Sequence, residues 1–233
     1  MAQPVLFEVK GNIAIITLNR SNKRNAIDQD LMMNLCNSFE RFSKDSEIRV
    51  GILTGSGDTF CAGLDLSSPI TGNIMDFLDI WKEIDKPIIG AINGHAITGG
   101  FELALNCDFL IASENASFAD THAKMGIHPG WGITQLLQQA VGIRMAKQIS
   151  LSCRFFSARQ MLNSGLVNEV VPREKLMERC MEIAHEIASV NQEMLGVVKK
   201  LIEQGGDGTH REGMLREREG FMNFLAKMEA LKK

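Results

Sequence analysis

The segment from Asn93 to Asn106 constrains the fold of this chain more than any other, because an apolar strand passes there into a helix through a glycine pair. The apolar residues from 88 to 92 are typical of a short buried strand. Gly99 and Gly100 carry no Cβ, so the backbone can approach a ligand closely at this point. From Phe101 onward the apolar spacing predicts a buried helix.

Glu102 falls in the first turn of this expected helix. Unpaired backbone N–H groups and the positive end of the helix dipole meet there, which favours a site that stabilises an anion beside an acid/base group. A second interpretation is purely local. Gly99 would cap the helix and Glu102 would be the glutamate three positions later, with no chemistry involved.

A second glycine-bearing turn strengthens the first interpretation. The residues from Thr59 to Asp65 follow another apolar strand, 50 to 53, and they place small residues where that strand ends. Two such turns can supply two converging N–H donors, which is what an oxyanion hole requires.

Composition excludes several classes of protein. The chain has 233 residues, of which 45% are hydrophobic, so one sizeable core is expected. The net charge of −3 gives no reason to expect a nucleic-acid partner. No apolar run reaches about 18 residues, so no membrane span is predicted. The N-terminal residues lead directly into a strand-like stretch, from which we expect a cytoplasmic protein.

Cysteine and histidine usage predicts neither a disulfide nor a metal site. The five cysteines are scattered and are expected to be reduced packing residues. Cys61 invites a nucleophile hypothesis because it lies in the second turn, but no histidine is near it in sequence. The five histidines show no ligand spacing, so no metal is expected. Trp131 is expected to fill core rather than to wall a pocket.

Strand-like and helix-like segments alternate along the first two thirds of the chain, which predicts an α/β fold with parallel pairing. After Ser157 the chain is expected to be mainly helical. One apolar stripe there has helical spacing and is expected to pack in the core; it contains Leu176, Cys180, Ile183, Ala184 and Ile187.

The runs Phe60–Asp65 and Asn93–Ala104 together resemble the enoyl-CoA hydratase/isomerase family, also called the crotonase family. Leu18–Arg20 with Asn25–Ala26 and several later fragments extend the resemblance over nearly the whole chain. The resemblance implies a crotonase-like spiral of ββα turns with a C-terminal helical oligomerisation region. Residues 1–155 would form the acyl-CoA-binding core, and residues 156–233 would assemble subunits into a homotrimer or homohexamer.

The family's shared chemistry is stabilisation of an enolate formed from an acyl-CoA thioester. The resemblance places the two oxyanion-hole N–H donors at Leu64 and Gly99, and the first of two family glutamates at Glu102. The second glutamate position, four residues after Phe118, holds His122 instead. A histidine can exchange protons near neutral pH, and Asp120 could orient it or share its role.

Contacts to the CoA ester are also carried over from the resemblance. The loop near the Asn-Ala step would meet the nucleotide end, although Lys23 and Arg24 would equally suit an ordinary solvated loop. The residues implied in substrate or CoA binding are Lys23, Arg24, Ala26, Ala62, Asp65, Leu66, Phe224 and Lys227.

The expected activity is hydration of a 2-enoyl-CoA, with Glu102 activating water and returning its proton. Family Δ3-to-Δ2 isomerases tend to keep a carboxylate at the second position and dispense with the first, and this chain shows the reverse pattern. The alternatives are such an isomerase, another acyl-CoA enzyme such as a hydrolase or decarboxylase, and a non-catalytic oligomer that binds CoA esters. No cofactor is expected, because coenzyme A is part of the substrate.

Overall fold

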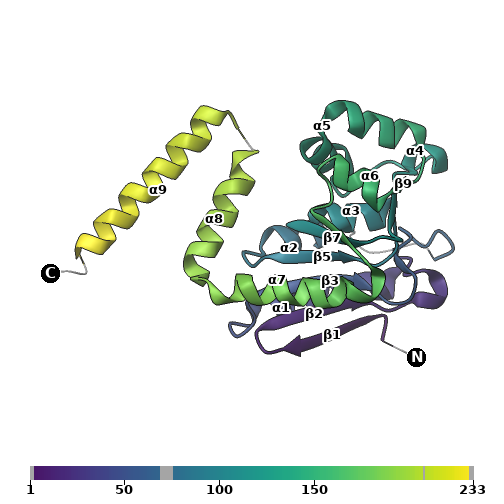
Figure 1. The fold of residues 1–233 in the computed structure, drawn as a ribbon, viewed down its shortest axis with the longest axis horizontal. Coiled ribbons are helices and arrows are strands. Elements are labelled where there is room, and N and C mark those ends of the chain that lie inside the picture. The colour runs from purple at the N-terminus through teal and green to yellow at the C-terminus, as the bar shows by residue number, and fades with distance from the viewer. Residues whose placement is uncertain (1–2, 69–75, 207, 231–233) are drawn as a thin grey trace. The chain divides into compact units, whose positions relative to one another are not determined.

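The computed structural model describes residues 3–68, 76–206 and 208–230. They belong to two compact units, Met1–Ser189 and Val190–Lys233. The first unit contains both β-sheets and the helices packed on them. In Figure 1 the ribbon is coloured along the chain, from purple at the N-terminus to yellow at the C-terminus. The second unit is a pair of helices, α8 (Gln192–Gly205) and α9 (His210–Ala230).

A six-stranded sheet forms the base of the first unit. Its strand order is β1-β2-β3-β5-β7-β10, and all neighbours are parallel except the hairpin of β1 with β2. The strands are β1 (Val5–Lys10), β2 (Ile13–Leu18), β3 (Val50–Gly55), β5 (Ile88–Ile92), β7 (Phe109–Ser113) and β10 (Glu169–Val171).

A smaller, four-stranded sheet has the order β4-β6-β8-β9. Its strands are β4 (Thr59–Cys61), β6 (His95–Ile97), β8 (Ser117–Ala119) and β9 (Phe156–Ser157), and only β8 with β9 is antiparallel. The chain alternates between the sheets, because β3, β5 and β7 are each followed by a strand of the smaller sheet and then by a helix. This repeated step confirms the predicted spiral of ββα turns. The helices that follow the three steps are α2 (Asp76–Lys82), α3 (Gly99–Asn106) and α4 (His122–Met125).

The remaining helices of the first unit surround the sheets. They are α1 (Gln29–Lys44), α5 (Ile133–Ser152), α6 (Ala158–Asn163) and α7 (Leu176–Ser189), with short 3₁₀ turns at Ser21–Lys23 and Arg173–Lys175. None of the helices in the described parts of the chain is both long enough and apolar enough to span a bilayer.

Two clusters of buried side chains hold the first unit together. One lies between the six-stranded sheet and α7, where Ile52 and Ile89 meet Leu176, Cys180 and Ala184. The predicted apolar stripe is therefore core, as its helical spacing indicated. The larger cluster includes fully buried phenylalanines from several elements, namely Phe39, Phe42, Phe60, Phe101 and Phe118.

The boundary between the units differs from the one expected at residues 155 and 156. β9 pairs with β8, β10 pairs with β7, and α7 packs on the large sheet, so residues 156 to 189 belong to the first unit. Long-range strand pairing joins them to the core, which local helix content could not indicate. The role of the C-terminal helices in subunit assembly stays a prediction.

Asn25 connects the N-terminal segment to the turn after β3 and to β4. Its side chain is fully buried, and its amide nitrogen donates to the carbonyl oxygens of Ser56 at 2.9 Å, Thr59 at 2.7 Å and Phe60 at 3.1 Å. Its side-chain oxygen accepts the backbone N–H of Arg20 at 2.9 Å. Because one side chain satisfies groups from two distant segments, the position of β4 depends on it.

Arg20 holds the turn that follows β4. Its guanidinium lies 2.8 Å from the Asp28 carboxylate and 3.2 Å from that of Asp65, and it also donates to the Ala26 carbonyl. The side chain of Asp65, expected to take part in substrate or CoA binding, is thus held by an ion pair within the protein.

We expect Asn25→Ala to lower the free energy of unfolding by about 2–4 kcal/mol, because it strands several buried backbone groups without a partner. Chemical denaturation would measure the loss. Asn37→Ala, at an exposed position of α1, is the matched control and should change stability by less than about 0.5 kcal/mol. Equal stability of Asn25→Ala and the unmutated protein would contradict this account of the turn.

Candidate active site

A cavity of about 240 Å³ opens where three parallel strands of the smaller sheet end. The turns after β4, β6 and β8 all reach it, because β4 pairs in parallel with β6 and β6 with β8. Parallel strands bring their carboxyl ends to one edge of a sheet. The polar side chains lining the cavity are Thr98, Glu102, Thr121, His122 and His128, and the larger apolar ones are Leu64, Leu66, Met125, Ile127 and Trp131.

The two glycine-bearing turns lie directly against each other. A Cβ placed on Gly99 would lie 3.5 Å from the Cα of Gly63 and 3.7 Å from the backbone nitrogen of Leu64. A Cβ on Gly100 would lie only 2.2 Å from the carbonyl oxygen of Cys61, so a side chain there would push the turns apart. The absence of a side chain at Gly100 is what allows the close approach.

The backbone N–H groups of Leu64 and Gly99 are the predicted oxyanion donors, and both residues line the cavity. On the other side of this turn, Ile27 donates its N–H to Gly63 and accepts that of Asp65, each at 2.8 Å. Within the described residues, neither the Leu64 nor the Gly99 amide donates to a protein acceptor. Two neighbouring, unsatisfied N–H groups in a concave site can bind an oxygen that carries negative charge.

Glu102 is held in the cavity wall by backbone groups from the segment before α5. Glu102 is 2% exposed, and its Oε1 accepts the N–H of Trp131 at 2.8 Å and that of Ile133 at 3.4 Å. Burial raises the pKa of Glu102, and the N–H donors offset only part of this effect. A carboxylate with a raised pKa is a stronger base than an ordinary one.

The local capping interpretation of Glu102 is wrong. Thr98, not Gly99, is the N-cap of α3, and it makes no side-chain capping bond. The backbone N–H of Thr98 donates to the Ala119 carbonyl, so it does not pair with the glutamate.

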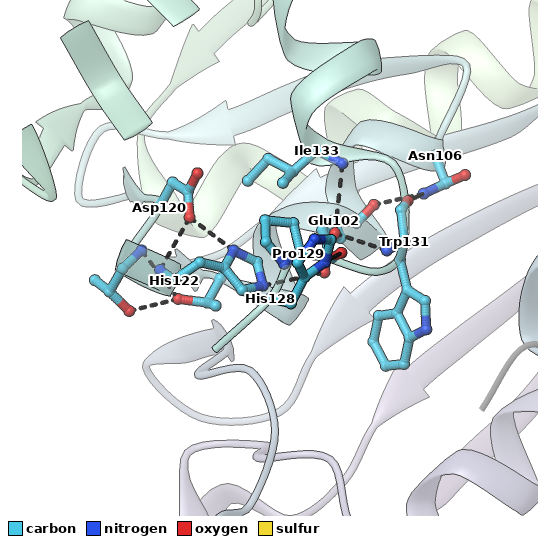
Figure 2. Close-up of polar contacts among 10 residues, drawn as sticks. Glu102, Asn106, Asp120, His122, His128, Pro129, Trp131 and Ile133 are labelled. Carbon is cyan, nitrogen blue, oxygen red and sulfur yellow. Dashed lines mark hydrogen bonds and ion pairs between the residues drawn. The ribbon is translucent and has the colours of Figure 1, made fainter. Parts of the chain in front are cut away.

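His122 and Asp120 complete a linear array with Glu102, as Figure 2 shows. The Asp120 Oδ1 lies 2.8 Å from the His122 ring Nδ1 and also accepts the His122 backbone N–H at 3.1 Å. On the far side of the ring, Nε2 lies 3.7 Å from the Glu102 Oε2. His122 is 6% exposed and Asp120 is 2% exposed, so the array is almost entirely enclosed by protein.

Asp120 fixes the orientation of the imidazole. Burial acts to raise the pKa of Asp120, but hydrogen bonds from the His122 ring, the Ser150 side chain and the His122 N–H outweigh it and leave the pKa below its usual value. An ionised Asp120 favours a proton on Nδ1, so Nε2 is free to exchange a proton on the side that faces Glu102. The structure therefore brings together the three side chains predicted to be catalytic.

The other predicted binding residues are distributed unevenly. Ala62 and Leu66 line the cavity, whereas Lys23 and Arg24 are exposed on a neighbouring loop. The Ala62 N–H donates to the Arg24 carbonyl at 3.1 Å, so this loop runs beside the turn after β4. The half-buried Ala26 belongs to the same loop.

Phe224 and Lys227 lie on α9, in the second unit. Their contact with the nucleotide stays a prediction, as do the roles of the other binding residues.

Cys61 does not have the character of a nucleophile. It is fully buried, and burial raises the pKa of its thiol to about 12. No group of three or more His, Cys, Asp or Glu side chains in the described residues is arranged to hold a metal ion.

Sequence reasoning missed the contribution of Trp131. Its ring would lie 3.4 Å from a Cβ on Gly99, it lines the cavity, and its backbone N–H holds Glu102. A backbone donor leaves no mark on residue identity, so only the fold could reveal this contact. Ser150, far along α5, was missed because only the fold brings its side chain to Asp120.

Comparison with known proteins agrees with this geometry. The profile of the family described as Enoyl-CoA hydratase/isomerase matches residues 8–232. A protein of Arabidopsis thaliana called probable enoyl-CoA hydratase 1, peroxisomal, is 40% identical over 210 residues, which cover 86% of this chain and 79% of that protein. The short-chain-enoyl-CoA hydratase of Clostridium acetobutylicum is 36% identical over 212 residues, covering 86% and 81% of the two chains.

A solved structure shares the fold at high similarity. The crystal structure of enoyl-CoA hydratase from Bacillus anthracis superposes with a TM-score of 0.90 at 32% identity, and the match covers 99% of this chain and 95% of that one.

The raised pKa of Glu102 makes stability depend on pH in a defined direction. The folded protein holds this proton more tightly than the unfolded chain does, so the resulting stability is fully present below the unfolded pKa of about 4.3 and is lost as the pH rises through the folded pKa. Above the folded pKa, the buried charge of the glutamate is therefore a cost that a glutamine avoids.

We expect Glu102→Gln to raise Tm at pH 7 by about 2–4 °C, the change that about 1 kcal/mol produces in a domain of this size. The gain should shrink as the pH falls toward about 4. Calorimetry over a pH series would measure it, with Glu47→Gln, at an exposed position, as the control for loss of one charge. A variant that melts below the unmutated protein at pH 7 would refute the prediction.

Proposed function

The chain belongs to the enoyl-CoA hydratase/isomerase family, and from this premise we propose that it is an enoyl-CoA hydratase, a hydro-lyase of acyl-CoA metabolism. The reaction adds water across the 2,3 double bond of a 2-enoyl-CoA thioester. One observation carries the proposal: Glu102 and His122 line the same small cavity as Leu64 and Gly99, whose backbone N–H groups have no protein acceptor among the described residues. Asp120 bonds to the His122 ring on the side away from Glu102.

The N–H groups of Leu64 and Gly99 would hold the thioester oxygen. Hydration passes through a state in which negative charge moves from the double bond onto this oxygen, so the donors bind the transition state more strongly than the substrate. Loss of one such donor typically costs about 10²–10³ in rate, which makes the oxyanion hole the largest single catalytic contribution.

Glu102 would act as the base and then as the acid. Its carboxylate takes a proton from water while the water oxygen bonds to C3, and the C2–C3 π electrons move into the enolate. Glu102 then returns the same proton to C2 and the carbonyl re-forms. One water is added and no proton is left over, so the reaction needs no cofactor beyond the CoA ester itself.

His122 would position the attacking water through Nε2. The 3.7 Å separation between Nε2 and the Glu102 Oε2 is longer than a direct hydrogen bond. Both atoms can instead reach one water, which the two groups would hold at the end of the double bond. Asp120 supports this role because it fixes the ring and its proton.

Assembly and location remain predictions. A homotrimer or homohexamer is expected, and the many exposed apolar residues of α8 and α9 are compatible with subunit contacts; they include Met194, Val198, Ile202, Phe221 and Leu225. A cytoplasmic location is also only expected, since the Arabidopsis relative is named as peroxisomal.

The loss of conjugated-thioester absorbance on mixing with crotonyl-CoA tests the proposal. We expect turnover by the unmutated protein and a fall in kcat of about 10²–10⁴ in Glu102→Gln, because the variant cannot carry the proton. His122→Ala should lower kcat by about 10². His95→Ala, at an exposed site on β6, is the matched histidine control and should keep full activity.

Other outcomes would assign other functions. Full hydration activity in Glu102→Gln would remove Glu102 from the mechanism. If the unmutated protein binds crotonyl-CoA without turnover but converts a 3-enoyl-CoA to the 2-enoyl isomer, it is an isomerase. Binding of CoA esters with no turnover of either substrate would indicate a binding protein.

A further inference from the structure

Thr98 has a backbone conformation that a threonine rarely adopts. Its φ is 53° and its ψ is −111°, a combination that is normal for glycine but crowds a β-branched side chain. Such a residue is locally strained and persists only where its surroundings fix it. Thr98 lies immediately before Gly99, between β6 and α3. A glycine at this position would be free of that strain.

The hydroxyl of Thr98 bonds to the loop that carries His122. Its Oγ1 lies 2.5 Å from the Thr121 Oγ1 and accepts the Thr121 backbone N–H at 3.2 Å. The Thr98 backbone N–H donates in turn to the Ala119 carbonyl at 2.9 Å. The strained residue therefore makes three bonds to the segment 119–121, and both threonines line the cavity.

Each of the two threonines immediately precedes a residue of the proposed site. Thr98 precedes Gly99, whose N–H is one oxyanion donor, and Thr121 precedes His122. Strand pairing places Ile97 opposite Ala119, but it ends there. Beyond this point the hydroxyl pair links the turn after β6 to the loop after β8.

We propose that the Thr98–Thr121 hydroxyl pair is a positioning bridge that sets the distance between the Gly99 oxyanion donor and the His122 imidazole. This role rests on the proposed hydration reaction, which requires the thioester oxygen and the attacking water to be held at the same time. A shift of about 1 Å in such a group can cost about 10² in rate. Neither threonine takes part in proton transfer.

Valine substitutions separate this role from a merely structural one, because valine keeps the shape and the β-branch while it removes the hydroxyl. We expect Thr98→Val to lower kcat for crotonyl-CoA by about 10- to 100-fold with KM within about twofold, since the lost interaction acts only in the transition state. Thr98→Ser retains the hydroxyl and should restore most of the rate.

Thr121→Val gives a second approach if Thr98→Val folds poorly. Because the two hydroxyls act as one bridge, the double variant should lose no more activity than the worse single variant. Thr54→Val is the matched control: it removes another buried threonine bond, to the Ala91 carbonyl at 2.9 Å, but lies away from the cavity. It should lower Tm and leave kcat unchanged.

A measurement that does not depend on hydration tests the bridge separately from the proposed function. Acetoacetyl-CoA forms an enolate whose absorbance reports binding in the oxyanion hole, and Thr98→Val should lower the bound enolate fraction several-fold. If the unmutated protein binds this enolate but does not hydrate crotonyl-CoA, the proposed function fails while the bridge is still tested.

Three results would overturn the bridge. They are unchanged kcat and enolate binding in both valine variants, no recovery in Thr98→Ser, and losses that add fully in the double variant. Each would mean that the hydroxyl pair stabilises the fold without setting the geometry of the site.

Discussion

The site depends on the contact between two backbone turns, one after β4 and one after β6. Parallel pairing of these short strands brings the turns to one edge of the smaller sheet, and the lack of a Cβ on Gly100 lets them touch. Without that contact the N–H groups of Leu64 and Gly99 would not converge. Asn25 and Arg20 maintain it from the far side, because they bind the carbonyls and the carboxylate of the first turn.

The same arrangement buries the ionisable side chains Glu102, Asp120 and His122. Glu102 is held by two backbone N–H groups but remains short of full compensation, which is why burial raises its pKa. Asp120 is better compensated, with three donors to its carboxylate, and its pKa lies below the usual value. Two carboxylates on opposite sides of one imidazole are therefore suited to different purposes: Glu102 to the proposed proton exchange, and Asp120 to holding the orientation of His122.

Local patterns predicted the elements well. The apolar spacing identified α3 and the core-facing side of α7. Glu102 was correctly placed in the first turn of α3. The domain boundary was misplaced at 155 because β9 and β10 are two and three residues long, and their membership in the sheets depends on partners far away in the chain.

The sequence by itself determined the residue types of the site: a glycine pair at a strand end, a glutamate one turn into the following helix, and a histidine two residues after an aspartate. Such features are local, and their spacing along the backbone fixes their geometry. Only the tertiary structure decided that Nε2 of His122 faces Glu102, that the Trp131 N–H holds that carboxylate, and that Thr98 is strained to reach Thr121. These contacts join turns about twenty to thirty residues apart through sheet pairing and backbone donors, which the identity of a residue does not encode.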